Sequence, residues 1–230
     1  MTPDVPTPDD PSMRQEQGAA GEGSTIVLAT GNQHKLIELR RILEESGTGG
    51  VRVLGLHDLP PVPPVTEDGL TFAENSLLKA EAVARATGLP TIADDSGLCV
   101  AALGGAPGIF SARWCGRHGD DAANLDLLLA QLADLRDEHR SAWFACAATL
   151  ATRDGRHWTV EGRVDGRLIR QQRGENGFGY DPIFVPDGED RTTAQMTPVE
   201  KDAISHRGRA LRGLLPLVSR LIRAQAAPGT

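Results

Sequence analysis

The sequence TIVLATGNQHK, residues 25–35, decides the fold of this 230-residue chain. Its first five residues are β-branched or apolar, which predicts a short strand. Leu36, Leu39, Ile42 and Leu43 follow at helical spacing, so a helix begins soon after the strand ends. The stretch therefore predicts a strand, a tight turn and a helix, which is the unit from which α/β sheets are built.

The turn of this unit has the features of an anion site. Gly31 allows the backbone to approach a ligand closely, and the first amides of the helix are unpaired. Lys35 adds a positive charge where the helix dipole is already positive. An ordinary strand-to-helix turn with a surface lysine has the same sequence, so the turn alone leaves both interpretations open. The residues concerned are Thr30, Gly31, Asn32, Gln33, His34 and Lys35.

Composition limits the classes of partner. The formal net charge is −7 and the sequence pI is about 5.4, so the chain lacks the basic excess of proteins that follow a nucleic-acid backbone. We therefore expect no nucleic-acid polymer as partner. A small polyanion is still compatible with an acidic protein, because a local lysine cluster or a metal ion can bind it.

Cysteine usage and hydropathy predict the compartment. Cys99, Cys115 and Cys146 form no close pair and no Cys-x-x-Cys motif, which argues against disulfides and zinc. No apolar stretch approaches the roughly 20 residues of a membrane span, and the N-terminus has no signal-peptide core. We expect a soluble, cytoplasmic protein with no membrane contact.

The chain divides into a tail and one domain. Residues 1–23 are rich in Pro, Asp, Gln and Gly, and predict a disordered tail. Residues 24–226 predict a single α/β domain with a mixed sheet, since an Arg153-Asp154-Gly155-Arg156 hairpin turn accompanies the strand-helix units. Besides the first unit, we expect strands at residues 51–54, 91–93, 143–152 and 157–164. We expect helices at residues 72–87 and 121–135, a helix that begins at Pro198, and a last helix at residues 205–224 that Pro216 bends.

Carboxylates follow one of these strands. Asp94 and Asp95 come after the predicted strand 91–93, where open α/β sheets place ligands, although the sequence Asp-Asp-Ser-Gly is also typical of a simple turn. Neighbouring side chains on a strand point to opposite faces, so at most one of the pair enters a given cleft. Glu67-Asp68, in a separate loop, adds oxygen ligands of the kind that Mg²⁺ shares with substrate phosphates.

Other polar residues are ambiguous on their own. Lys79 lies on a predicted helix and is by default a surface lysine. Lys201 and Ser205-His206-Arg207 come at the starts of the last two helices, where positive charge opposes the dipole and indicates an anionic ligand. Phe178 and Tyr180 lie in a glycine-rich loop, where they either stack on a planar base or pack under the hairpin.

Six segments occur in order between Ile26 and about Leu215: TGNQHKLIE, TFAENSLLKA, ADDSGL, GGAPGIFSARW, GFGYDPIF and EKDAISHRG. Together they resemble the inosine/xanthosine triphosphate pyrophosphatase family, also called XTP/dITP diphosphatases. The resemblance implies hydrolysis of ITP, dITP and XTP to the monophosphate and pyrophosphate with Mg²⁺. It also implies a homodimer whose elongated mixed sheet, flanked by helices, forms two lobes around a central cleft.

The resemblance also implies residue roles. Thr30 to Lys35 would hold the triphosphate, and Lys79 and Lys201 would neutralise it. Glu67 and Asp95 would hold the metal, with Asp95 also accepting the proton of the attacking water, so that Asp95 and Lys79 are the catalytic pair. The nucleotide would be contacted by Ser96, Phe178, Gly179, Tyr180 and Asp181, with His206 and Arg207 completing the base pocket.

Three positions depart from the family pattern, namely Asn176, Ala101 and Trp114. Asn176 replaces a glycine, which a left-handed backbone would tolerate. Trp114 replaces a tyrosine and is expected to affect lobe or dimer packing. Two further functions are compatible with the sequence: a pyrophosphatase for modified pyrimidine nucleotides, and a nucleotide-binding regulator without catalysis.

Overall fold

The computed structural model describes residues 25–30, 33–45 and 51–226. The tail predicted at residues 1–23, and Gly31 and Asn32 of the turn, lie outside these ranges, as do the side chains of Gln33 and His34. Among the described residues, no helix combines the length and the apolar composition that a membrane span requires.

The described residues form one mixed sheet with the strand order β2-β1-β3-β4-β5-β6. β1 runs parallel to β2 and to the start of β3, and the remaining pairs are antiparallel. The predicted mixed α/β fold is therefore confirmed. The strands are β1 (Thr25–Leu28), β2 (Arg52–Gly55), β3 (Thr91–Val100), β4 (Ser141–Ala151), β5 (His157–Leu168) and β6 (Phe184–Pro186).

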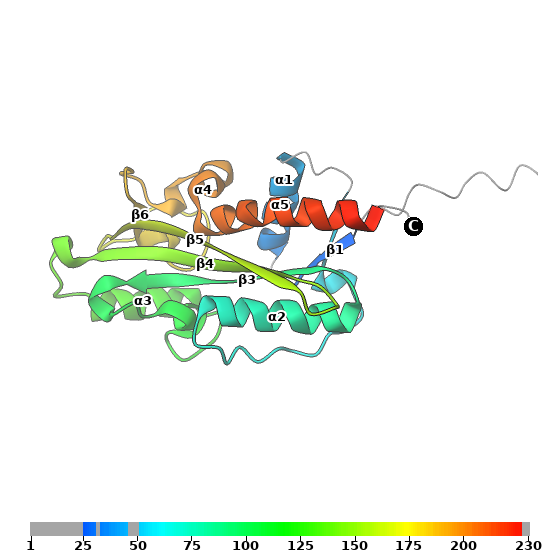
Figure 1. Cartoon of the computed structure of the whole chain (residues 1–230). Helices are drawn as coiled ribbons and strands as arrows, with labels where there is room; N and C mark the ends of the chain where they lie inside the picture. Colours follow the sequence, from blue (N-terminus) through cyan, green and yellow to red (C-terminus); the bar gives the residue numbers. More distant parts are fainter. Residues whose placement is uncertain (1–24, 31–32, 46–50, 227–230) are drawn as a thin grey trace, which may run out of the picture.

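Helices cover both faces of the sheet. Figure 1 shows α1, α4 and α5 on one face and α2 on the other. The helices are α1 (Gln33–Glu45), α2 (Phe72–Thr87), α3 (Asp121–Gln131), α4 (Pro198–Ile204) and α5 (His206–Ala226). The sheet is therefore the middle layer of three, and each face presents side chains to a different set of helices.

The apolar side chains form three clusters, two on the α5 face of the sheet and one on the α2 face. The predicted helix face Leu36, Leu39, Ile42 and Leu43 is buried, and it packs with α5 against β1 and β4. α3 covers the far ends of β3 to β6 in a second cluster. α2 approaches the sheet through small residues, with Ala80 and Ala84 packed on Ala93 and Ala151, which allows close contact.

α2 begins and ends as the sequence predicts. The side chain of Thr71 accepts a hydrogen bond from the backbone of Glu74, and Glu74 bonds back in a capping box. Gly88 ends the helix in a left-handed conformation with φ of 72°. These two signals fix the helix that carries Lys79.

Three boundaries differ from the prediction. β3 continues to Val100 instead of turning at Asp94, because β4 pairs with it along its whole length. α3 ends at Gln131, where the carbonyl of the next residue, Leu132, accepts a hydrogen bond from Arg140. α5 continues through Pro216, and the bend predicted there stays a prediction.

The short length of β1 exposes an edge of β3. β1 ends at Leu28, which lies opposite Ile92, whereas β3 continues for eight more residues. The backbone amide of Leu98 on the same edge bonds to the Ser111 hydroxyl. Between these two points, β3 has an edge that β1 does not cover, and Asp94, Asp95 and Ser96 lie along it.

Gly162 in β5 permits α5 to lie directly on the sheet. A methyl group at Gly162 would overlap the carbonyl oxygen of His206 and lie 2.8 Å from the backbone nitrogen of Ala210. Only a residue without a side chain fits there, so Gly162 sets the position at which α5 begins.

We predict that Gly162→Ala displaces the start of α5 and lowers the free energy of unfolding by about 1–3 kcal/mol, as overpacking typically does. Chemical denaturation measures this change. Arg167→Ala, on the solvent side of the same strand, is the control and should change stability little. A Gly162→Ala variant as stable as the control would contradict this account.

Candidate active site

Asp94 and Asp95 point to opposite faces of β3, as the alternation of a strand predicts. Asp94 contacts Lys35 of α1 and Arg207 of α5. Asp95 contacts Asn75 and Lys79 of α2. The two adjacent carboxylates therefore organise separate clusters, one on each face of the sheet.

On the α1 and α5 face, Asp94 holds two cations. Its Oδ2 lies 2.7 Å from Lys35 Nζ and 3.1 Å from Arg207 Nε. Arg207 also donates to the Ser96 hydroxyl at 3.0 Å and lies 3.5 Å from a carboxylate oxygen of Glu38. This cluster fixes Lys35 and Arg207 relative to β3.

The charges in this cluster stabilise each other. Burial alone would raise the pKa of Asp94, but the charges of Lys35 and Arg207 outweigh it and hold that pKa well below its usual range. Burial likewise opposes the charge of Arg207, and Asp94 and Glu38 outweigh it, so the pKa of Arg207 is raised. Both residues are ionised at neutral pH.

On the α2 face, Lys79 joins two carboxylates. Its Nζ lies 3.3 Å from Glu67 Oε1 and 3.3 Å from Asp95 Oδ1. Glu67 and Asp95 come from a loop and a strand that are far apart in the sequence. Lys79 is only 16% exposed, so it is not the surface lysine that is the default for a helix.

Asp95 differs from Asp94 in the direction in which its pKa is shifted. Burial raises the pKa of Asp95, and Lys79 and the Asn75 amide offset this only in part. A carboxylate whose pKa is raised in this way is a better proton acceptor than an ordinary aspartate. Asp95 therefore has the chemistry of a general base, whereas Asp94 has that of a fixed counterion.

The donor set on the α2 face fits a hard divalent cation. Glu67 and Asp95 supply carboxylate oxygens from two segments, and the ammonium of Lys79 already lies between them as a cation would. Within the part of the chain that the structure describes, no group of three or more His, Cys, Asp or Glu residues gathers around one point. Two protein carboxylates suit Mg²⁺ that takes its other ligands from phosphates and water.

Asn75 is a site residue that the sequence reasoning did not single out. It is fully buried, donates to Asp95 Oδ2 at 3.1 Å and accepts from the backbone of Gly69 at 2.9 Å. One amide thus fixes both the strand carboxylate and the loop that carries Glu67. Its place in the TFAEN segment, one turn before Lys79, was the available signal.

The loop around Phe178 is held by Asp181. This buried carboxylate accepts hydrogen bonds from Lys201 Nζ at 2.5 Å, from the Phe178 amide at 2.8 Å and from the Thr193 hydroxyl at 2.8 Å. Lys201 lies in the last turn of the short α4, where its charge agrees with the helix dipole. The predicted conflict with the dipole at Lys201 is therefore wrong, because α4 has only seven residues.

The two aromatic residues of this loop behave differently. Tyr180 is buried in the second core cluster and donates to the Ser111 carbonyl at 2.9 Å. Phe178 is 44% exposed, and Lys201 Nζ and the Arg207 guanidinium lie 5.1 and 5.8 Å from its ring centre. Phe178 is thus the aromatic ring available to a ligand.

His206 is a buried imidazole at the start of α5. Its ring stacks on Phe144 with the centroids 4.9 Å apart. Burial, together with the charges of Arg207 and Lys201, lowers the pKa of His206 well below its usual value. A neutral imidazole has one donor and one acceptor nitrogen, which suits recognition of a neutral base.

Two cavities meet at Phe178 and share Asp121, Lys201, His206 and Arg207 in their walls. The cavity of about 560 Å³ extends along α1 past Lys35, and the cavity of about 90 Å³ reaches Ser96 and Gly179. The structure therefore brings the predicted residues of β3, α4, α5 and the aromatic loop together. It places Glu67 and Lys79 on the other face.

The uncovered edge of β3 connects the two faces. β1 ends at Leu28, opposite Ile92, and Thr30 comes two residues after this end. Ile92 lies two residues before Asp94 in β3. A ligand at this edge has Asp94 on one side of the sheet and Asp95 on the other. At this edge, groups of both clusters come within reach of a single molecule.

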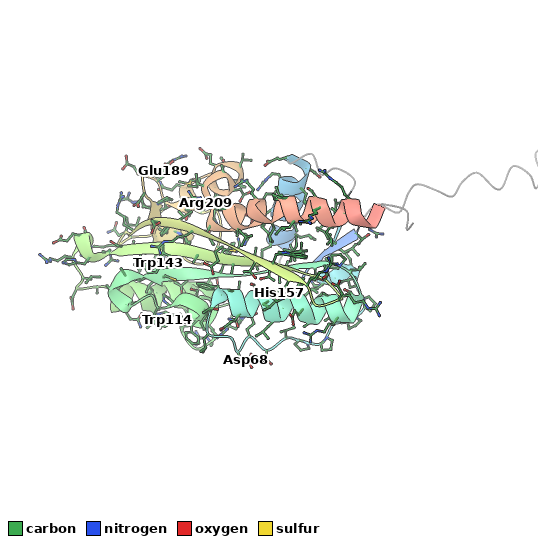
Figure 2. All side chains as sticks on the ribbon, viewed as in Figure 1. Asp68, Trp114, Trp143, His157, Glu189 and Arg209 are labelled. Atoms are coloured by element: carbon green, nitrogen blue, oxygen red, sulfur yellow. The ribbon has the colours of Figure 1, made fainter. Side chains whose placement is uncertain are left out.

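The structure shows the surroundings of the three positions that depart from the family pattern. Asn176 does not have a left-handed backbone; Gly174 and Gly177 on either side have it, and the Asn176 amide bonds to the Met196 carbonyl. Trp114 lies beside α3 (Figure 2), where it bonds to Gln131 and packs on the second core cluster. Ala101 is exposed after β3.

A model of the Ham1 family matches residues 26–217, most of the chain. The chain belongs to the Ham1 family. It is 59% identical over 197 residues to a dITP/XTP pyrophosphatase of Streptomyces coelicolor, covering 86% of this chain and 98% of that protein. It is 56% identical over 196 residues to a dITP/XTP pyrophosphatase of Nocardia farcinica, covering 85% and 95%.

Solved structures of Ham1 proteins have the same fold. A nucleoside-triphosphatase, or dITP/XTP pyrophosphatase, from Mycobacterium abscessus has a TM-score of 0.70 at 55% identity, covering 84% of this chain and 99% of that one. A HAM1 protein from Coxiella burnetii has a TM-score of 0.78 at 40% identity, covering 86% and 99%. The predicted family and fold are confirmed.

The two neighbouring aspartates should respond oppositely to neutralisation. We predict that Asp94→Asn lowers the free energy of unfolding by about 3–5 kcal/mol, because it removes the carboxylate that pairs with part-buried Lys35 and buried Arg207 and leaves Arg207 only Glu38. Asp95→Asn should be neutral or stabilising, because it removes a carboxylate that burial disfavours. Denaturation at pH 7 compares the two, and a larger loss in Asp95→Asn would contradict the assignment.

The pH dependence has a matching sign. The pKa of Asp94 is lowered by folding, so its contribution to stability is present above its unfolded value and is lost as the pH falls toward the folded one. The difference in the free energy of unfolding between wild type and Asp94→Asn should therefore become smaller as the pH is lowered from 7 into the acid range.

Proposed function

We propose that this Ham1 protein hydrolyses dITP, XTP and ITP to the nucleoside monophosphate and pyrophosphate, and so removes deaminated purines from the nucleotide pool. The observation that supports it best is the pair Asp94 and Asp95 on the uncovered edge of β3, each with its own lysine. Relatives of this chain are named for the same activity.

In this proposal, the turn from Thr30 to Lys35 binds the phosphates. Its amides begin α1, and the Lys35 ammonium lies 18% exposed next to Asp94, where it can turn to a phosphate oxygen. Phosphoryl transfer to water requires neutralisation of the phosphate charge and an oriented water molecule, and it does not need a covalent nucleophile from the protein. Lys79 and Lys201 supply further positive charge, and Asp95 accepts the proton of the water.

We propose Mg²⁺ as the cofactor, held by Glu67 and Asp95. When bound, the ion supplies charge stabilisation to the phosphates and lowers the pKa of water. Asn75 keeps Asp95 and the Glu67 loop in position for it. Lys79, which contacts both carboxylates, balances their charges until the ion binds.

The base pocket is proposed to lie between Phe178 and His206, with Ser96, Gly179, Tyr180 and Asp181 in or behind its walls. Inosine and xanthine present an acceptor oxygen where adenine presents an amino donor. Neutral His206 has one N–H, and Arg207, held by Asp94, Ser96 and Glu38, has further N–H groups for this oxygen. A donor left unpaired by adenine costs about 1–3 kcal/mol.

We also propose a homodimer. Leu70 and Phe110 are 84% and 49% exposed on the α2 side of the sheet, beside a groove of about 680 Å³ that includes Trp143. A second copy of the chain is the simplest cover for these apolar groups.

Residues 24–226 are proposed to act as one domain, since every core cluster packs on the same sheet. The proposed compartment is the cytoplasm.

A substrate panel tests the proposed function. With Mg²⁺ present, dITP, XTP and ITP should release pyrophosphate with kcat/KM at least about tenfold above ATP, which is the discrimination expected from one unpaired donor. Preference for modified pyrimidine triphosphates would support the pyrimidine alternative. Tight binding of ITP without turnover would instead support a regulator.

Asp95→Asn tests the catalytic base. It should lower kcat for dITP by about 10²–10⁴-fold, the usual contribution of a general base, while nucleotide binding persists. In the metal-free wild type, the pKa of Asp95 measured by NMR titration should lie above the ordinary Asp value of 3.8, because burial raises it. Near-normal turnover in Asp95→Asn would overturn the assignment.

Phe110→Glu tests the proposed dimer. It should convert the protein to a monomer in light scattering after gel filtration, because a charge on the contact surface is costly to bury. Ile37→Glu, which changes an exposed apolar residue of α1 on the opposite face of the sheet, is the control. A monomeric wild-type protein would contradict the homodimer.

A further inference from the structure

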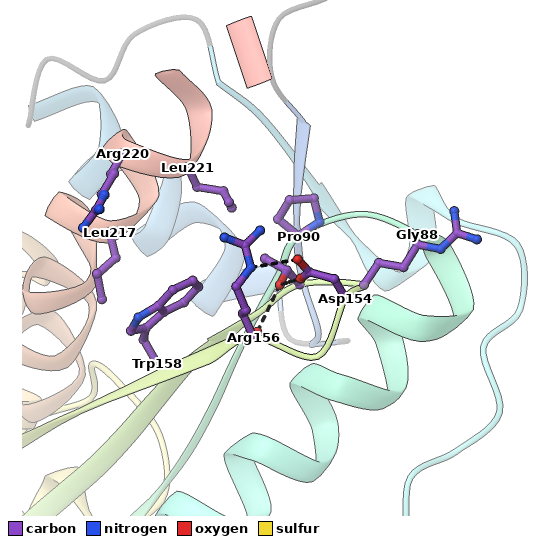
Figure 3. A pocket seen from close by; sticks show the side chains of 10 residues that line it. Gly88, Pro90, Asp154, Arg156, Trp158, Leu217, Arg220 and Leu221 are labelled. Atoms are coloured by element: carbon purple, nitrogen blue, oxygen red, sulfur yellow. Dashed lines mark hydrogen bonds and ion pairs between the residues drawn. The ribbon is translucent and has the colours of Figure 1, made fainter. Parts of the chain in front are cut away.

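A second polar cavity lies at the opposite end of β3 from Val100 and has no part in the proposed catalysis (Figure 3). Its volume is about 650 Å³, and it lies between the β4–β5 hairpin, the end of α2 and the last turns of α5. The side chains that define its chemistry are Arg153, Arg156, Trp158, Arg220 and Leu221.

The cavity has an excess of positive charge. Arg156 is paired with Asp154 at 2.8 Å. Within the part of the chain that the structure describes, the side chains of Arg153 and Arg220 form no hydrogen bond or ion pair. Two exposed arginines without a counterion on either side of one cavity favour an acidic ligand.

The floor of the cavity is apolar. Trp158, Leu217 and Leu221 are only partly buried against the core of the α5 face. Figure 3 shows Trp158 between Leu217 and Arg156, and the Arg156 guanidinium lies 6.0 Å from the Trp158 ring centre. A ligand that fits this cavity combines carboxylates with apolar groups of modest size.

The N-terminal segment of the chain enters the fold beside this cavity. The Val27 amide bonds to the carbonyl of Pro90, which lines the cavity. β1 runs parallel to the start of β3 with Val27 opposite Thr91, so the chain enters β1 at the end of the sheet where Gly88 and Pro90 line the cavity. Residues 1–24 therefore join the described part of the chain at the rim.

The composition of this segment complements the cavity. Its ionisable side chains are five carboxylates and one arginine, Arg14, and residues 2–11 read TPDVPTPDDP. Prolines of this density favour the extended polyproline conformation, which binds to grooves lined by aromatic residues. Asp4, Asp9 and Asp10 add the charge that the arginines lack. The Ham1 model begins at residue 26, so this segment is outside the family pattern.

We propose that residues 2–11 of this chain bind in the cavity, with the prolines on Trp158 and the aspartates at Arg153 and Arg220. The fourteen residues from Pro11 to Ser24 extend to at most about 50 Å, which is ample for a return to the rim of the cavity. The cost of closing so short a loop is small, because it grows only with the logarithm of its length.

Trypsin tests this proposal on the full chain, because Arg14 is the only tryptic site in residues 1–24. Cleavage after Arg14 at low salt is measured by mass spectrometry. It should be about tenfold faster in R153E/R220E than in wild type, because proteolysis follows the population of molecules in which residues 2–11 are not bound to the cavity. R136E/R167E, with the same change of charge elsewhere on the surface, should cleave at the wild-type rate.

The acidic side of the contact gives a second measurement. D4N/D9N/D10N should accelerate the cleavage by a similar factor, and combining it with R153E/R220E should add little, because both remove the same interaction. High salt should accelerate cleavage only in wild type and in the control. Equal cleavage rates in all variants would overturn the proposal.

A different occupant would also be detected. If inosine monophosphate or inorganic pyrophosphate binds the wild-type cavity by calorimetry, and R153E/R220E loses this binding while the Arg14 cleavage rate is unchanged, the cavity belongs to a small anion. That result would overturn the assignment to residues 2–11.

Discussion

The alternation of side chains along β3 is the constraint on which the site depends. Two consecutive aspartates on a strand cannot share a face, and each buried carboxylate needs cations or amides near it. Asp94 meets this need with α1 and α5, and Asp95 meets it with α2. The three layers of the fold are thus tied together at two adjacent residues.

The same geometry separates the tasks of the two carboxylates. Asp94 is surrounded by cations and is a permanent anion that fixes Lys35 and Arg207. Asp95 has a raised pKa, because burial outweighs its partners, and so it retains an affinity for protons. The early end of β1 leaves this edge of the sheet open, which is why one substrate can be proposed to contact both faces.

The fold was largely predictable because its signals are local. The apolar spacing after Lys35, the capping box at Thr71 and the hairpin turn after Thr152 each act within a few residues. The continuation of β3 was missed, because Asp-Asp-Ser-Gly favours a turn and only pairing with β4, some fifty residues later, makes it a strand. Asn75 was missed for a similar reason, since its partners are distant in sequence or lie in a loop.

The sequence by itself determined the family, the residue types of the site and the opposite orientation of Asp94 and Asp95, because motifs and strand periodicity are properties of neighbouring residues. Only the tertiary structure decided which cation meets which carboxylate, that His206 is buried and neutral against Phe144, and that Phe178 rather than Tyr180 is open to a ligand. These depend on burial and on electric fields from distant segments, which exist only once the helices have packed on the sheet.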